Sequence, residues 1–255
     1  MSKIKNILEV LKIVKNWSTY FTDYFHLINS SHTVYRLKNG ISLMVRSGSN
    51  DRVIFNQVWL NNVYLPNGFE IKDDDIVIDI GAHIGLFAVL AAFYAKKGKI
   101  YAFEPVKENF ELLNENINQN KITNILTYNK AVSGDGEMRD FVLSSGSNAA
   151  HSFDYTDSKS SKKVKVQTVR LEDFINENEI KKIDFFKIDC EGAEYEIIFN
   201  LPKNLLKIIK KIGMEYHDID GDRNVTKMKK YLEDNGFSVR VETIGDNMLY
   251  ARQNQ

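Results

Sequence analysis

The sequence predicts an α/β protein with a mostly parallel sheet and helices on both of its faces. Short apolar runs suited to buried strands alternate with segments whose apolar residues recur at helical spacing, which is typical of βαβ units. In the clearest unit, the apolar run 76–80 is interrupted only by Asp79 and is followed by an alanine-rich segment from Ile84 to Phe93. Four predicted strands end in polar residues, and parallel strands bring such ends to one edge, where open α/β sheets bind ligands.

The composition is that of a globular protein able to bury a substantial core. Hydrophobic residues make up 43% and charged residues 27% of the 255 residues, which allows one large domain or two small ones. Lysine and arginine together number 34, as do aspartate and glutamate. No overall field therefore favours nucleic acid, and no nucleic-acid partner is expected.

Two features predict a cytoplasmic protein. Cys190 is the single cysteine, which excludes an internal disulfide, suits a reducing compartment and fits a packed residue better than a nucleophile. Charged residues interrupt every apolar run near the N-terminus before the core of a signal peptide can form. No stretch approaches the roughly 18 apolar residues that a membrane span requires.

The first 70 residues predict a cap of helices and a hairpin. Residues 3–16 read as an amphipathic helix, and an aromatic-rich run follows over 17–28. This lysine-edged stripe could lie on a membrane surface, pack on its own domain or meet a dimer mate. Asn39-Gly40 separates two strand-like runs and predicts a hairpin, after which a helix is expected over 50–64.

Gly81 and Gly85 bracket the junction between the first predicted strand and its helix, as expected for a nucleotide-cofactor loop. Glycine permits a sharp turn there, and the first N–H groups of the helix point at the ligand. A dinucleotide site uses G-x-G-x-x-G, but here His83 replaces the middle glycine, which disfavours NAD. S-adenosylmethionine has no phosphate, and Asp79 could face its amine while the loop takes its carboxylate.

A second acid supports a nucleoside-containing ligand. The apolar run 100–103 ends in Glu104-Pro105, about 20 residues beyond the glycine loop, where such folds place the acid that binds ribose hydroxyls. The polar segment 144–163 reads as a loop, which could be a binding lid or a surface insert. The remaining elements predicted are helices over 108–120 and 171–178 and around 197–199 and 225–232, and strands over 125–132, 141–143, 164–169, 183–188, 211–217, 237–243 and 247–252.

Four motifs resemble the FkbM family of class I S-adenosylmethionine-dependent methyltransferases. They are Asp79-Ile-Gly-Ala-His-Ile-Gly85, Phe103-Glu-Pro105, Asn129-Lys-Ala-Val-Ser133 and Lys187-Ile-Asp-Cys-Glu-Gly-Ala-Glu194. The resemblance runs from about residue 51 to 250 and implies a Rossmann-like class I methyltransferase fold with a mostly parallel seven-stranded sheet. It also implies a methyltransferase domain over 71–255 that binds S-adenosylmethionine, following the cap of 1–70. Two positions depart from the family pattern, His83 where asparagine is usual and Gln57 where an acid is common.

The resemblance and the residue types together predict which residues bind the cofactor. Residues just past the third strand of such folds tend to meet the adenine, which points to Ala131 and Val132. The full predicted set is Asp79, Gly81, Ala82, His83, Gly85, Glu104, Pro105, Ala131, Val132 and Asp189.

Catalysis by transfer to a hydroxyl requires a base, and several candidates end the later strands. Lys187 and Asp189 project to the same side of a strand, and a lysine so placed is either the partner of a carboxylate or tuned for catalysis. His217 is the preferred base, because the free pKa of histidine lies near neutrality. Glu191, Glu215 and the pair of Lys187 with Asp189 compete with it, and no metal site is predicted from these residues.

The predicted function is S-adenosylmethionine-dependent O-methylation of a hydroxyl on a small molecule or a sugar or glycan. Two alternatives stay open. One is an NAD-type dinucleotide oxidoreductase, and the other is a non-catalytic module that keeps the fold and binds a membrane or partner through its N-terminal helix.

Overall fold

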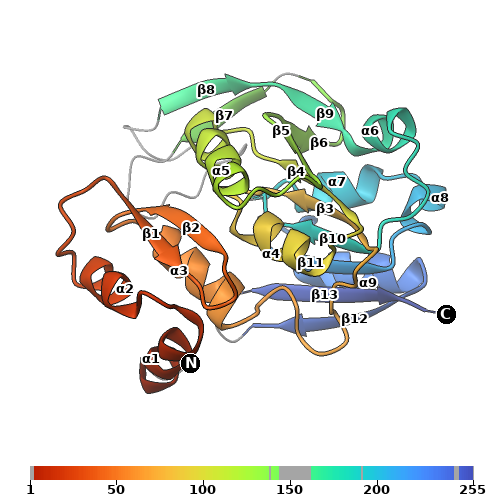
Figure 1. The fold of residues 1–255 in the computed structure, drawn as a ribbon. Helices are drawn as coiled ribbons and strands as arrows, with labels where there is room; N and C mark the ends of the chain where they lie inside the picture. The colour runs from red at the N-terminus through yellow and green to blue at the C-terminus, as the bar shows by residue number, and fades with distance from the viewer. Residues whose placement is uncertain (1–2, 138, 144–161, 191, 244–246, 255) are drawn as a thin grey trace.

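The computed structural model describes residues 3–137, 139–143, 162–190, 192–243 and 247–254, and its centre is one seven-stranded sheet (Figure 1). The strand order is β12-β13-β11-β10-β3-β4-β5, parallel from β11 to β5 and closed by antiparallel pairing of β13 with β11 and of β12 with β13. The predicted Rossmann-like fold with its mostly parallel sheet is therefore confirmed. The strands are β3 Ile76–Ile80, β4 Lys99–Phe103, β5 Ile125–Tyr128, β10 Phe185–Ile188, β11 Lys211–Glu215, β12 Phe237–Glu242 and β13 Met248–Gln253.

The strand order reverses beside β3. The chain runs from β3 outward through β4 and β5, then returns to the other side of β3 as β10 and continues to β11. Asp79 in β3 thus has Ala102 of β4 on one side and Lys187 of β10 on the other. A crevice opens at such a switch point, outside the carboxyl ends of the strands.

Helices cover both faces of the sheet, and each face has its own hydrophobic cluster. Successive residues of β3 point to opposite faces, so that Val77 packs with α4 and α5 while Ile78 and Ile80 pack with α6, α7 and α9 (Figure 1). The helices are α4 Leu86–Tyr94, α5 Lys107–Gln119, α6 Leu171–Glu177, α7 Glu194–Asn200, α8 Lys203–Leu206 and α9 Val225–Asp234. The short α8, which follows Pro202, was not predicted.

The N-terminal segment packs into the cluster that covers α4 and α5, where Tyr35 and Phe55 are completely buried. It contains α1 Lys3–Ile13, α2 Trp17–Tyr24, and the predicted antiparallel hairpin of β1 His32–Arg36 and β2 Ser42–Arg46. The helix predicted over 50–64 is instead the short α3 Asp51–Phe55 followed by a π-helical turn, η1 Asn56–Leu60. The buried Trp59 lies in this turn, and its indole N–H donates to the carbonyl of Leu86.

Asn116 of α5 and Asn120, the residue that follows this helix, pair with the edge of β2 as a neighbouring strand would. The Asn116 side chain accepts from the N–H of Met44 and donates to its carbonyl, at 2.7 and 3.0 Å. The Asn120 side chain does the same with Ser42, at 2.8 and 2.6 Å. Because Asn116 also donates to the carbonyl of Ile84, this helix links the hairpin to the glycine loop.

The single strand predicted over 125–132 is divided, which corrects that prediction. After β5 the chain leaves the main sheet, since the Asn129 side chain donates to the carbonyls of Glu104 and Pro105. Residues Ala131–Ser133 then form β6, which pairs in parallel with β9 Thr168–Arg170. The flanking pair of β7 Arg139–Leu143 and β8 Lys162–Val166 is antiparallel, and residues 144–161 between them lie outside the described residues.

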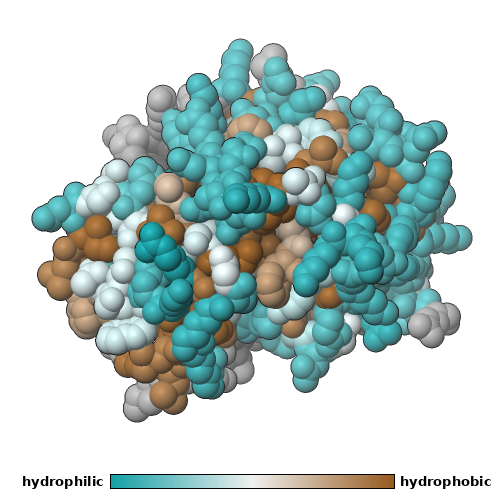
Figure 2. All heavy atoms as spheres, viewed as in Figure 1, coloured by the Kyte–Doolittle hydropathy of each residue, from teal (hydrophilic) through white to brown (hydrophobic). Residues whose placement is uncertain are grey.

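Figure 2 shows apolar surface over α1 and α2, edged by hydrophilic side chains. The exposed large hydrophobic residues there are Ile7, Leu8, Leu11, Trp17, Tyr24, Phe25 and Leu27. Within the described ranges, no helix combines the length and the apolar character needed to cross a membrane.

Candidate cofactor and active site

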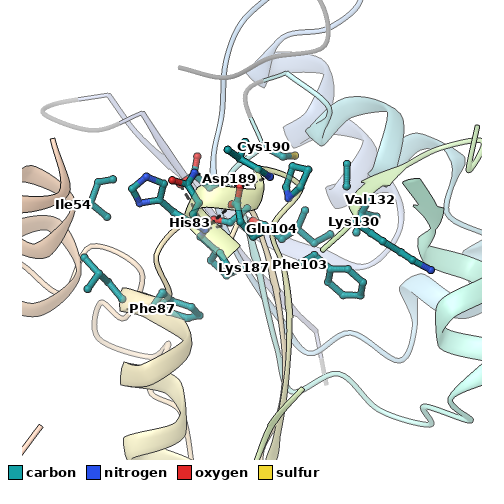
Figure 3. Close-up of a pocket in the computed structure, with 18 of the residues that line it drawn as sticks. Ile54, His83, Phe87, Phe103, Glu104, Lys130, Val132, Lys187, Asp189 and Cys190 are labelled. Atoms are coloured by element: carbon teal, nitrogen blue, oxygen red, sulfur yellow. Dashed lines mark hydrogen bonds and ion pairs between the residues drawn. The ribbon is translucent and has the colours of Figure 1, made fainter. Parts of the chain in front are cut away.

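A pocket lies at the carboxyl ends of β3, β4 and β10, where the sheet topology predicts a crevice (Figure 3). The loop after β3, the end of β4, β6 and the turn after β10 all contribute to its wall, and residues of α3 and η1 close one side. The pocket brings together most of the residues predicted to bind a cofactor. Those that line it are Gly81, Ala82, His83, Glu104, Pro105, Ala131, Val132 and Asp189, with Lys187 and Cys190 beside them.

Only glycine fits at the two bracketing positions of the loop. Gly81 has a φ of +74°, and a Cβ there would lie 1.7 Å from the carbonyl oxygen of Asp189. Gly85 has a φ of +83°, and its Cβ would lie 2.4 Å from Leu113 Cδ1. Gly85 does not line the pocket; its role is to let α4 begin close against α5.

Glu104 is buried and its carboxylate organises the pocket floor. Oε2 accepts from the N–H of His83 at 2.8 Å, and Oε1 accepts from the N–H of Val106 at 2.9 Å and from Asn109 at 3.3 Å. Burial raises the pKa of Glu104 to about 7, although these three donors oppose the rise. A carboxylate has about four acceptor positions, and three are used by these donors. One position can therefore still accept a hydrogen bond from a hydroxyl of a ligand in the pocket.

Lys187 joins two aspartates beneath the loop. Its Nζ lies 3.2 Å from Asp79 Oδ1 and 3.6 Å from Asp189 Oδ2, and it donates to the carbonyl of Gly81 at 2.6 Å. Burial alone lowers the pKa of Lys187, but the two carboxylates outweigh it and the pKa is raised. Lys187 is thus a cation at neutral pH and holds no lone pair with which to act as a base.

Asp79 lies below the pocket rather than in its wall, unlike the expectation that it faces the ligand directly. Its side chain is completely buried and is covered by Lys187. Burial raises the pKa of Asp79, and the ammonium of Lys187 opposes that rise. Asp189, 28% exposed, is the carboxylate of the pair that reaches the pocket.

Tyr64 connects the N-terminal segment to residues at the carboxyl ends of β10 and β11. Its hydroxyl donates to Asp189 Oδ2 at 2.9 Å and approaches Glu215 Oε2 at 3.4 Å, while its ring lies 5.3 Å from the Lys187 ammonium. Burial raises the pKa of Tyr64 well above its ordinary value, so the phenol stays a donor.

His83 is held by a pair of residues that sequence reasoning missed. Its Nε2 lies 3.0 Å from a guanidinium nitrogen of Arg46, which also grips both carboxylate oxygens of Asp51 at 2.9 Å. Burial lowers the pKa of His83 to about 4, so the ring is neutral at neutral pH. One indication in the sequence that Asp51 belongs to the site is its position at the start of the region that resembles the family.

Two of the remaining catalytic candidates, His217 and Glu215, are not among the residues that line the pocket. His217 follows β11 and places Nδ1 3.0 Å from Oε1 of the fully buried Glu194. The Glu215 carboxylate approaches the pocket-lining Tyr64, whose hydroxyl lies 3.4 Å from Glu215 Oε2. Glu191 lies outside the described residues. Across the described chain, no group of three or more His, Cys, Asp or Glu is arranged to hold a metal ion.

The sheet topology, the glycine loop and the acid that ends β4 define a class I methyltransferase fold. The sequence profile of the methyltransferase FkbM domain matches residues 79–239. The chain belongs to the FkbM methyltransferase family, which confirms the resemblance seen in its motifs, and it is a methyltransferase.

Three relatives are similar in sequence to this chain. The 31-O-demethyl-FK506 methyltransferase FkbM of Streptomyces tacrolimicus is 25% identical over 235 residues, which cover 81% of this chain and 89% of the relative. Hexuronic acid methyltransferase AglP of Haloferax volcanii is 24% identical over 185 residues, 72% of this chain and 74% of AglP. The 2-O-methyltransferase NoeI of Sinorhizobium fredii is 26% identical over 161 residues, 58% of this chain and 65% of NoeI.

A solved structure supports the fold. The crystal structure of methyltransferase FkbM from Methylobacillus flagellatus KT matches 97% of this chain with a TM-score of 0.53 and 13% identity. This chain spans 58% of that solved chain.

Proposed function

We propose that the protein is an S-adenosylmethionine-dependent O-methyltransferase whose acceptor is a hydroxyl on a small molecule or a sugar. The observation that carries the cofactor is one pocket lined by the glycine loop, by buried Glu104 and by β6. Bound S-adenosylmethionine supplies an electrophilic methyl group on a sulfonium, and the residues of the chain bind and orient the two reactants.

The pocket chemistry fits the three parts of that cofactor. Glu104 has the remaining acceptor capacity for ribose hydroxyls, and the apolar wall of Phe103, Ala131 and Val132 suits an adenine. Asp189 is the exposed member of a cluster in which two carboxylates share one lysine, so it suits the amine of the methionine end. In this proposal Asp79 acts indirectly, by fixing Lys187 and through it the carbonyl of Gly81.

Oxygen is the acceptor atom that the relatives favour. Two of their names specify methylation at an oxygen, and a third names a hexuronic acid as the substrate. Transfer to a hydroxyl needs a proton acceptor. Among the described candidates the bases are His217, Glu215 and Asp189, whereas protonated Lys187 is better suited to holding the loop.

Calorimetric titration with S-adenosylmethionine and S-adenosylhomocysteine tests the cofactor directly. We expect the wild type to bind both, and Glu104→Ala to weaken binding at least tenfold because the ribose loses a charged acceptor. Glu111→Ala, which removes an exposed carboxylate on α5, is the matched control and leaves affinity unchanged. Absence of binding by the wild type would refute the proposal, and tight NAD binding would favour the oxidoreductase alternative.

The acceptor is tested with a panel of methyl glycosides that includes a methyl glucuronide. Methyl transfer from S-adenosylmethionine labelled in its methyl group is followed by mass spectrometry of the products. Label on an oxygen of a panel member supports the proposal, and label found only on nitrogen or carbon of acceptors in a cell extract contradicts O-methylation.

A further inference from the structure

The turn after β10 and the segment after β11 are joined by the Glu194 carboxylate. Glu194 is the first residue of α7, and this acidic residue is completely buried. Oε1 accepts from the N–H of Cys190 at 3.1 Å and Oε2 accepts from the N–H of Gly192 at 2.8 Å. A buried acid with such partners fixes the backbone that leads away from Asp189.

The same carboxylate contacts the imidazole of His217. The distance from Glu194 Oε1 to His217 Nδ1 is 3.0 Å, and the imidazole is 28% exposed while the glutamate is inaccessible. A carboxylate oxygen can only accept, so the proton of this hydrogen bond belongs to Nδ1. When Nδ1 carries the proton in a neutral imidazole, the basic lone pair is on Nε2.

A second contact clamps the same two segments and provides an internal comparison. The Tyr195 hydroxyl donates to Asp218 Oδ1 at 3.2 Å, and Asp218 also accepts from the N–H of Val225 at 2.7 Å. Adjacent residues of α7 thus hold adjacent residues after β11. Of the two contacts, only that between Glu194 and His217 involves a histidine, the side chain whose free pKa lies near neutrality.

We infer that Glu194 is a positioning residue that holds His217 as its Nδ1–H tautomer, so that Nε2 is the base on the acceptor side of the pocket. The inference rests on the proposed O-methylation. The acceptor hydroxyl gives its proton to Nε2 and its oxygen bonds to the methyl carbon, while the electron pair of the former carbon–sulfur bond stays on sulfur. The imidazolium that forms is stabilised by the Glu194 carboxylate, as an orienting acid stabilises the histidine of a serine protease.

His217 lies on the correct side for this role. Cys190 lines the pocket, and its N–H shares Oε1 of Glu194 with the imidazole. The residues proposed to bind the adenosine follow β3 and β4 or lie in β6, and Asp189, proposed to bind the amine, follows β10. His217 follows β11, on the far side of β10 from β3. The acceptor would therefore approach over the ends of β10 and β11.

The decisive experiment reads the tautomer of His217 by two-bond ¹H–¹⁵N correlation at pH 8, with the signal assigned by its loss in His217→Gln. We expect the Nδ1–H form in the wild type. Glu194→Leu leaves no side-chain oxygen to accept from Nδ1–H, and the ring should lose its preference for that tautomer. Tyr195→Phe removes only the neighbouring clamp and should leave the tautomer unchanged.

Catalysis and binding then separate a catalytic effect from a structural one. On any acceptor of the panel that the wild type methylates, Glu194→Gln should lower kcat by about 10³- to 10⁴-fold, with the affinity for S-adenosylhomocysteine changed less than threefold. Tyr195→Phe should keep kcat within about threefold.

Three results would overturn the inference: an Nε2–H tautomer in the wild type, an unchanged tautomer in Glu194→Leu, or equal loss of activity in Glu194→Gln and Tyr195→Phe. A wild type that binds no S-adenosylhomocysteine, or methylates no oxygen, refutes the proposed function instead. The tautomer remains measurable in either case.

Discussion

The central sheet has one cluster of paired charges at the carboxyl ends of its strands, called here the carboxyl edge, and another at their amino ends, called the amino edge. The first is a lysine between two aspartates, and the second is an aspartate between two lysines. At the carboxyl edge, Lys187 lies between Asp79 and Asp189. At the amino edge, Asp184 lies between Lys182 and Lys210. Both central residues are buried, but the two flanking lysines are 42% and 57% exposed, whereas Asp79 is inaccessible.

The difference decides where the unbalanced charge of each cluster lies. At the amino edge, burial raises the pKa of Asp184, but the N–H of Ile76 and the two lysines outweigh burial and lower it, and the surplus positive charge is in solvent. At the carboxyl edge the surplus is a carboxylate, and Asp189 presents it to the pocket. The extra charge of the amino edge thus lies in solvent, whereas the extra charge of the carboxyl edge lies in the pocket, where a ligand can meet it.

Removing the central cation of the carboxyl edge has the largest expected effect. Lys187→Met leaves Asp79 buried without a counter-ion and should lower the free energy of unfolding by about 3–5 kcal/mol. Urea denaturation measures this, and Lys187→Met/Asp79→Leu should recover most of the loss because no fully buried charge is then left without a partner. A single variant within about 1 kcal/mol of the wild type would show that the pair is not important for stability.

Neutralising the surplus charge should affect binding more than folding. Asp189→Asn is expected to weaken S-adenosylhomocysteine binding by about 10- to 100-fold, since a charged hydrogen bond contributes about 1.5–3 kcal/mol. Asp184→Asn is the matched change at the amino edge and should leave the Kd unchanged. Calorimetry on both variants tests the comparison, and equal Kd values for the two would remove it.

The pKa of Glu104 predicts that binding depends on pH. Because this pKa is about 7 and ribose hydroxyls donate to the ionised form, the affinity for S-adenosylhomocysteine should fall about tenfold between pH 8 and pH 6. Glu104→Gln should bind more weakly and flatten the profile. An unchanged pH dependence in that variant would assign the titration to another group.

The same shift has the opposite sign for stability without a ligand. The folded pKa lies above the ordinary value of 4.5, so the stabilisation from protonated Glu104 is present below about pH 4.5 and is lost as the pH rises through about 7. Denaturation of the ligand-free wild type and of Glu104→Gln over this range measures the difference.

The smallest effect is expected at the exposed side of the amino edge. Lys210→Gln leaves Lys182 paired with Asp184 and should cost less than about 1 kcal/mol, since exposed ion pairs are weak and are screened by salt. Denaturation at low and high salt checks this, and a loss above about 2 kcal/mol would make the two edges energetically alike.

Local patterns in the sequence predicted most strands and helices because burial repeats every second residue in strands and follows 3.6-residue spacing in helices. They failed at two places where the backbone changes course. Asn129 binds two carbonyls and ends β5, and the π-helical turn before Asn61 replaces a continuous helix. Neither event leaves a periodic signal.

The site was also predicted in part: some of its residues were recognised from the sequence, and others were not. The glycine loop and Glu104 were recognised because their spacing follows from how a strand meets a helix. The contacts of Arg46 with His83 and of Tyr64 with Asp189 join residues 37 and 125 positions apart, and no local pattern carries them. Only the structure shows that Lys187 of β10 covers Asp79 of β3, because the sequence motifs do not reveal which side chains of neighbouring strands are in contact.

Asn116 and Asn120, at the C-terminal end of α5 and just after it, have a consequence for how copies of this chain meet. Exposed strand edges invite another strand and can seed aggregation. At Ser42 and Met44 the backbone groups of β2 are already taken by amide side chains. An incoming strand would have to displace α5 before it could add to the hairpin, so this helix acts as a guard against edge-to-edge assembly.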